Sequence, residues 1–327
     1  MIRCTTTLER WAMREPFEIS RETIIDQAVL MVCLEDGRGC RGYAEAAGVD
    51  YDGETPDSIA AQIAAVQGHL HDEITGQTLL ELLPAGGARN ALDCALWDLR
   101  AKQTGVPAWQ AAGLAVLKPV MTDFTLGLGD EATTRRKARS ARQYPLLKLK
   151  VDASRHIDVV RMVRREHPGV RLIVDANQSW SLALLKELLP QLHEAGVELI
   201  EQPLPRGDDG ELDGLDSPVA LAADESCSDR SSLAQLVGRY QYINIKLDKC
   251  GGLTEALALA AQASATGFGL MVGNMCGSSL AMAPAFLLAQ QCRYVDLDGP
   301  LLQMEDRATP MVYNDALVQP PSAALWG

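Results

Sequence analysis

The pattern of hydrophobic and polar residues divides the chain into two parts. Residues 1–45 contain a short apolar strand, Ala28–Leu34, which is followed by a charged, glycine-rich turn. Between residues 55 and 120, apolar positions recur at helical spacing, and the last of these helices is expected to end at Gly105. A β-region followed by helices predicts an α+β domain over residues 1–120.

From residue 121 onward, short apolar runs alternate with amphipathic stretches of helical length. Repeated strand–helix units predict parallel strands joined by right-handed crossovers, and eight of them within residues 121–300 fit a TIM-like barrel. Residues 301–327 are irregular and are expected to pack back on the first domain. The expected strands are Met121–Leu126, Leu146–Lys150, Leu172–Asp175, Leu199–Glu201, Ala220–Asp224, Ile243–Lys246, Leu270–Val272 and Tyr294–Asp296.

Three of these strands end in an acid, at Asp175, Glu201 and Asp224. The carboxyl ends of parallel barrel strands meet at one mouth, so these side chains are expected to converge. Like charges in a desolvated site repel, and three close carboxylates therefore need a cation. Oxygen ligands without Cys or His favour Mg²⁺, with Mn²⁺ as the alternative.

Lysines flank this group of acids. Lys148 and Lys150 share one face of their strand, and Lys246 ends a strand on the opposite side of the predicted barrel. A metal with a lysine on each side is the geometry that a 1,1-proton transfer requires, because one amine can remove the proton beside a carboxylate while the other returns it to the opposite face. A lysine acts as such a base near neutral pH only where its pKa is lowered.

Each of these residues has a simpler interpretation when taken alone. An acid at a strand end is more often a helix cap or an ion-pair partner, and a lone pair of lysines is usually solvated. Asp248 and Lys249 are interpreted as solvated residues of this kind, and Glu225 either bonds Lys246 or caps a helix. The ordered series favours a site, because the steps from Lys150 to the next four charged strand ends are 25, 26, 23 and 22 residues, one strand–helix unit each.

This series, together with the segments PAGGARNALDCALWDL, DANQSW and INIKLDKCGGLTEALALA, resembles the enolase superfamily and its muconate-lactonizing-enzyme subgroup over nearly the whole chain. The resemblance implies a capping domain and a (β/α)₇β barrel, a modified TIM barrel. It further implies that Asp175, Glu201 and Asp224 are Mg²⁺ ligands. It implies that Lys150 and Lys246 are the two acid/base catalysts, and that Lys148 holds the substrate carboxylate and the enediolate.

Within the subgroup, Asp296-Leu297-Asp298 resembles the signature of dipeptide epimerases, whose two acids bind the free α-ammonium of the substrate. The implied reaction inverts the α-carbon of the C-terminal residue of an L,L-dipeptide, as in murein-peptide metabolism. Ala-Glu epimerases of the family have an arginine at the position of Ile24, so an apolar second residue stays open. Thr125 and Met275 are further expected substrate contacts. The alternative for Asp298 is that it only caps the next turn.

Composition narrows the function classes. The 327 residues have a net charge of −13 and a pI near 4.9, which argues against nucleic acid and anionic membranes as partners. The eight cysteines form no CxxC pair and are expected to be reduced thiols of a cytoplasmic enzyme. A homo-oligomer stays open. The alternatives are an N-acylamino-acid racemase, an o-succinylbenzoate synthase or a cycloisomerase of the same superfamily, a non-catalytic barrel, and an unrelated Mg²⁺-dependent aldolase.

Overall fold

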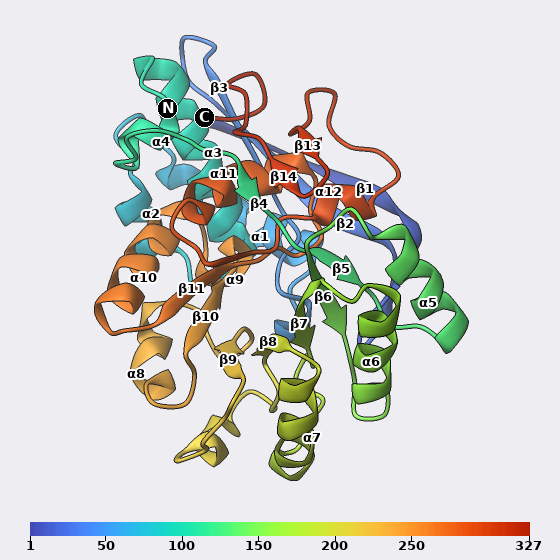
Figure 1. Cartoon of the computed structure of the whole chain (residues 1–327). Coiled ribbons are helices and arrows are strands. Elements are labelled where there is room, and N and C mark those ends of the chain that lie inside the picture. The colour runs from blue at the N-terminus through green and yellow to red at the C-terminus, as the bar shows by residue number, and fades with distance from the viewer.

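The computed structural model describes all residues 1–327, and its N-terminal part is an antiparallel sheet covered by helices (Figure 1). The three strands are β1 (Arg3–Glu18), β2 (Thr23–Glu35) and β3 (Arg41–Ala46). The helices are α1 (Pro56–Val66), α2 (Gly76–Leu82), α3 (Gly87–Thr104) and α4 (Ala108–Ala111). Helix α3 packs against β2 and β3 and ends at Gly105, as predicted. No helix is long and apolar enough to cross a bilayer.

The second part is a parallel sheet of eight strands in the order β12-β11-β10-β9-β8-β7-β6-β5, which confirms the predicted barrel. Its strands are β5 (Phe124–Leu126), β6 (Leu146–Lys150), β7 (Arg171–Asp175), β8 (Val197–Glu201), β9 (Ala220–Ala223), β10 (Tyr242–Ile245), β11 (Gly269–Val272) and β12 (Tyr294–Val295). Its helices are α5 (Glu131–Ser140), α6 (Ile157–Glu166), α7 (Leu182–Glu194), α8 (Leu233–Leu236), α9 (Leu247–Cys250), α10 (Leu253–Ala265), α11 (Ser279–Ala289) and α12 (Gly299–Leu302). Between β8 and β9 the connection holds only a 3₁₀ turn, Asp209–Leu212.

The alternation of side chains along the strands separates residues that face the surrounding helices from residues that face the inside of the barrel. In β6, Leu147 and Leu149 belong to the main apolar core, so Lys148 and Lys150 face the inside of the barrel. A separate apolar cluster includes Leu146 and Tyr294, which lie an even number of residues before the charged strand ends and therefore share their inward face. The barrel thus has an apolar interior that leads up to charged ends.

The expected strand Met121–Leu126 is wrong as a single element. Strand β4 (Val120–Met121) pairs instead with β14 (Leu317–Val318), which in turn pairs with β13 (Tyr313–Asn314). The barrel strand begins only at Phe124, because the chain passes between two sheets at Thr122 and Asp123. The split places Asp123 at the point where the barrel closes, and its N–H donates to the carbonyl of Val295.

The C-terminal segment contacts the N-terminal part of the chain. Trp326 Nε1 donates to the carbonyl of Cys94, and the N–H of Gly327 donates to Asp98, both on helix α3. The carbonyl of Gly327 accepts from the N–H of Ala108. Since one apolar core runs through all parts of the chain, the domain boundaries at residues 120 and 300 stay a prediction.

Candidate active site

The register of the barrel strands brings the predicted acids and lysines to the same level. Lys150 on β6 pairs with Asp175 on β7, and Asp175 pairs with Glu201 on β8. Asp224 follows β9, and Lys246 follows β10. All of these side chains are buried. The structure therefore places the predicted residues together at the carboxyl ends of the strands.

Lys148 lies among three carboxylates. Its Nζ is 2.6 Å from Asp296 Oδ2, 3.1 Å from Glu201 Oε2 and 3.4 Å from Asp175 Oδ2. Burial alone would lower the pKa of Lys148, but these carboxylates outweigh it and hold the pKa well above its usual value. Lys148 is therefore a fixed positive charge. The Lys150 Nζ lies nearer to Asp175 Oδ2 than the Lys148 Nζ does, at 2.6 Å.

Asp224 forms ion pairs with two lysines, Lys246 and Lys249, although the sequence predicts Lys249 to be solvated. Lys246 Nζ lies 2.7 Å from Asp224 Oδ2, and Lys249 Nζ lies 2.6 Å from Oδ1. The prediction that Lys249 and Asp248 are solvated is wrong, because both side chains of helix α9 are buried. Lys249 donates to the Asn244 carbonyl at 2.9 Å, and Asp248 accepts from a backbone N–H at 2.9 Å. Burial would raise the pKa of Asp224, but the two ammonium groups lower it below its usual value.

Two uncharged residues that sequence reasoning missed position the acids. Asn244 Nδ2 donates to Glu201 Oε1 at 2.7 Å, and Gln202 Oε1 accepts from the N–H of Asp224 at 3.0 Å. Gln202 has a positive φ of 33°, which turns the chain immediately after β8. Asn244 stands two residues before Lys246 on the same strand face, and this spacing is a signal that could have identified it.

A cavity of about 350 Å³ opens above the charged strand ends. Lys150 and Lys246 both line it, and so do Ile24 and Met275, which were predicted as substrate contacts. The segment between β1 and β2 forms one wall, and Arg21 from this segment reaches across to the barrel.

Arg21 joins the two parts of the molecule at this cavity. Its Nη1 donates to Glu225 Oε1 at 3.0 Å, and its Nη2 is 3.5 Å from Asp50 Oδ2. Glu225 therefore neither bonds Lys246 nor caps a helix; it also accepts from the side chain of Asn177 at 3.4 Å. Burial, followed by the charge of Asp224, raises the pKa of Glu225.

The two acids of the D-x-D segment lie beneath the cavity and do not line it. Asp298 Oδ2 accepts from the N–H of Thr125 at 2.6 Å, while its side chain makes no capping bond to α12, so the capping alternative is wrong. Burial and the neighbouring Asp296 raise the pKa of Asp298 to about 7. Thr125 lines a separate, smaller cavity beside Met13, and the structure does not bring its side chain into the main one.

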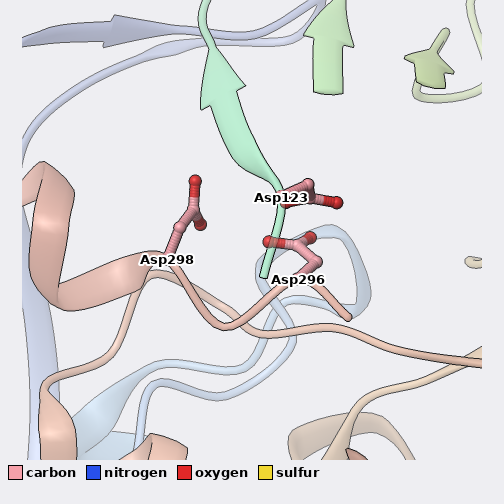
Figure 2. Close-up of side chains that lie close together, drawn as sticks. All are labelled: Asp123, Asp296 and Asp298. Atoms are coloured by element: carbon pink, nitrogen blue, oxygen red, sulfur yellow. The ribbon is translucent and has the colours of Figure 1, made fainter. Parts of the chain in front are cut away.

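The chemistry of Asp175, Glu201 and Asp224 fits a hard divalent cation. The three carboxylates are buried on adjacent strands, and Glu201 Oε2 has no hydrogen-bond partner although Lys148 lies 3.1 Å away. Burial, with the charge of Asp175, raises the pKa of Glu201 to about 7, which a bound cation would reverse. A tighter carboxylate group exists elsewhere: oxygen atoms of Asp123, Asp296 and Asp298 all lie within 4.8 Å of one another (Figure 2).

The match to known families follows this architecture. Residues 1–113 match the mandelate racemase/muconate lactonizing enzyme N-terminal domain, and residues 130–324 match the enolase C-terminal domain-like family. The chain belongs to the enolase superfamily. This membership confirms the resemblance of the ordered lysine and acid series, and it confirms the fold as a capping domain on a modified barrel.

Curated relatives of this superfamily member are racemases and epimerases. The N-acetyl-D-glutamate racemase of a Pseudoalteromonas species is 45% identical over 249 residues, which cover 76% of this chain and 79% of that protein. The L-Ala-D/L-Glu epimerase of Escherichia coli K12 is 42% identical over 294 residues, covering 89% of this chain and 91% of that protein. Both named substrates contain glutamate as the reacting residue.

Solved structures show the same fold. An enolase family member from Agrobacterium tumefaciens with homology to dipeptide epimerases, which contains sodium and L-Ala-L-Glu, has a TM-score of 0.97 and 41% identity over 100% of both chains. The dipeptide epimerase of Enterococcus faecalis, complexed with Mg and L-Leu-L-Tyr, has a TM-score of 0.91 and 25% identity, covering 99% of this chain and 98% of that chain.

Proposed function

We propose that the chain is a Mg²⁺-dependent epimerase that inverts the α-carbon of the C-terminal residue of an L,L-dipeptide, in the cytoplasm and on peptides of the murein type. The observation that supports it best is the position of the two lysines. Lys150 ends β6 and Lys246 follows β10, four strands apart in a barrel of eight, and both line the same cavity. Two amines on opposite sides of one cavity can act on opposite faces of one carbon.

Proton transfer requires these lysines to differ in protonation. One must be a neutral amine that removes the α-proton, and the other an ammonium that delivers a proton to the opposite face. Asp224 and Glu201 raise the pKa of Lys246 against the effect of burial, so Lys246 is an ammonium while these carboxylates are unshared. Asp175, Glu201 and Asp224 would hold a divalent cation, whose positive charge would offset these carboxylates and stabilise the charge that develops on the substrate carboxylate. Lys148 offers a further fixed charge beside Asp175 and Glu201.

A second candidate, N-acetylglutamate racemization, is favoured by the 45% identical relative of that name. N-acetylglutamate and L-Ala-L-Glu share the reacting glutamate and its acyl carbonyl, and they differ by the α-carbon of the alanine with its free ammonium group. Asp296 and Asp298 are buried acids that are suited to a cationic group and gain nothing from an acetyl methyl group. This pair therefore favours the dipeptide over the N-acyl substrate.

The deciding experiment compares L-Ala-L-Glu with N-acetyl-L-glutamate in D₂O with Mg²⁺, following loss of the α-proton by NMR. We expect the wild type to exchange the α-proton of the dipeptide. For Asp298→Asn, we expect a higher KM for the dipeptide, equivalent to a loss of about 2–5 kcal/mol of binding free energy. The KM should also rise as pH falls below about 7, where the Asp298 carboxyl takes up a proton. Exchange of N-acetylglutamate alone, unaffected by Asp298→Asn, would assign the second function.

The side chain of the reacting residue is read by a different part of the cavity. Ile24 and Met275 are apolar and offer no hydrogen bond to a carboxylate, but Arg21 lines the same wall. Its guanidinium retains donors beyond those that contact Glu225 and Asp50. We infer that Arg21 takes the place of the arginine that the family has at the position of Ile24, and that glutamate is the preferred second residue.

For Arg21→Met, we expect a higher KM for L-Ala-L-Glu, while the KM for L-Ala-L-Leu changes little. The rise should be equivalent to a loss of about 1.5–3 kcal/mol of binding free energy, the contribution of a hydrogen bond to a charged group. Steady-state kinetics with both dipeptides measures this ratio. Ile24→Arg in the Arg21→Met background should restore part of the preference for glutamate. An unchanged ratio of the two KM values in Arg21→Met would show that Arg21 only fastens the β1–β2 segment to Glu225.

A further inference from the structure

Asp123 is a buried acid whose carboxylate bonds nothing. Its side chain is 0% exposed, and neither of its carboxylate oxygens has a hydrogen-bond partner. Only the backbone of Asp123 has a structural role, since its N–H donates to the carbonyl of Val295 at 2.8 Å where the barrel closes. An unpaired buried carboxylate costs stability, so a structural role does not explain an acid at this position.

The carboxylate of Asp123 lies close to those of Asp296 and Asp298. Figure 2 shows Asp123 beside the start of β5 and the other two acids on the segment that leads into α12; oxygen atoms of all three lie within 4.8 Å of one another. One cation contacts this group: the Lys148 Nζ lies 2.6 Å from Asp296 Oδ2, and it is shared with Asp175 and Glu201. Three buried carboxyl groups therefore share one ammonium group.

The charges that face Asp123 come from three sides. Burial and the charge of Asp296 raise its pKa well above the usual value; Lys148 opposes this, and Asp298 and Glu201 add to it. A second positive charge between the three acids would oppose this rise in the pKa of Asp123. The group adjoins the main cavity through Asn274, which lines that cavity and donates from Nδ2 to Asp296 Oδ1 at 3.1 Å.

We propose that Asp123 joins Asp296 and Asp298 in one cation socket, and that its carboxylate is a third acceptor for the free α-ammonium of the dipeptide. This rests on the proposed function and adds to it a specificity-determining residue, Asp123, which lies outside the D-x-D segment. An ammonium group has three N–H donors, and the socket offers it one carboxylate for each. An acetyl group in the same place has no N–H donor and would leave Asp123 without a partner, so the socket selects dipeptides over N-acyl amino acids.

The test is Asp123→Asn, which keeps the shape and removes the charge. We expect the KM for L-Ala-L-Glu to rise roughly tenfold or more with little change in kcat. Any slow turnover of N-acetyl-L-glutamate should be unaffected, and the melting temperature should be equal or higher, because the variant removes a buried carboxyl group that has no hydrogen-bond partner. The control is Asp98→Asn on α3, which removes a buried charge that Lys102 and the N–H of Tyr43 satisfy. It should lower the melting temperature and leave both KM values unchanged.

Three results would overturn the socket. These are equal losses with both substrates in Asp123→Asn, an unchanged KM for the dipeptide, or turnover of N-acetylglutamate that Na⁺ or K⁺ stimulates through Asp123, which would make the occupant a metal ion. If Asp123→Asn does not fold, Asp123→Ser and calorimetric binding of L-Ala-L-Glu and N-acetyl-L-glutamate to the wild type with Mg²⁺ give the same comparison. Wild-type protein that exchanges no dipeptide would overturn the proposed function itself, and this outcome is distinguishable because it does not involve the variant.

Discussion

Lys150→Ala and Lys246→Ala should each abolish epimerization of the preferred dipeptide while leaving half of the exchange chemistry. Each variant loses the amine on one face of the α-carbon, and positioned acid/base groups contribute about 10²–10⁴-fold to such a step. The remaining lysine can still remove and return a proton on its own face. We therefore expect each variant to exchange the α-proton of only one epimer in D₂O, and the two variants to retain opposite epimers, as followed by NMR of the L,L- and L,D-dipeptides.

The opposite preferences are the sharp part of this expectation. A loss of exchange with both epimers in one variant would mean that this lysine acts through the predicted metal ligands and not on substrate, since Lys150 contacts Asp175 and Lys246 contacts Asp224. Lys249→Met is the matched control for Lys246→Ala, because it also removes a buried lysine that contacts Asp224. Lys249 does not line the cavity. This variant should alter Mg²⁺ binding through Asp224 and show no preference between epimers.

The residues that the sequence predicted best share one property: each is charged and ends a short strand that is mostly apolar. Lys150, Asp175 and Glu201 stand in register on neighbouring strands, so the repeat length alone indicates their convergence. The strand limits followed from the same contrast, and the errors at Met121–Leu126 came from a place where apolar character continues across two different sheets.

The residues that were missed depend on contacts that no local pattern records. Lys249 was assigned to solvent because it follows a strand end in a polar segment, yet the one-turn helix α9 directs it to Asp224. Arg21 lies more than 200 residues before its partner Glu225 in the chain, and only the packing of the β1–β2 segment over the barrel brings them together. Asp123 was hidden inside an expected strand, where alternation says which face a residue takes but not what surrounds it.

Asp224→Ala should have the largest effect on stability, because Asp224 neutralises two buried lysines at once. Lys246 and Lys249 are 6% and 4% exposed, and removing their shared carboxylate leaves two uncompensated ammonium groups. Breaking one buried ion pair in this way costs about 3–5 kcal/mol. Urea unfolding should therefore show a loss of at least this size, and activity should be undetectable, since the variant also removes a predicted metal ligand.

The metal arm of this experiment separates the two roles of Asp224. In the wild type, Mg²⁺ should raise the midpoint of thermal unfolding, because a ligand that binds only the folded state stabilises it. Asp224→Ala should lose that rise together with its stability. Combining Asp224→Ala with Lys249→Met removes one of the stranded charges and should recover part of the stability, but neither the Mg²⁺-dependent rise nor the activity. Recovery of the Mg²⁺ effect in the double variant would show that the cation is held by other carboxylates, for which the Asp123, Asp296 and Asp298 group would then be the place to look.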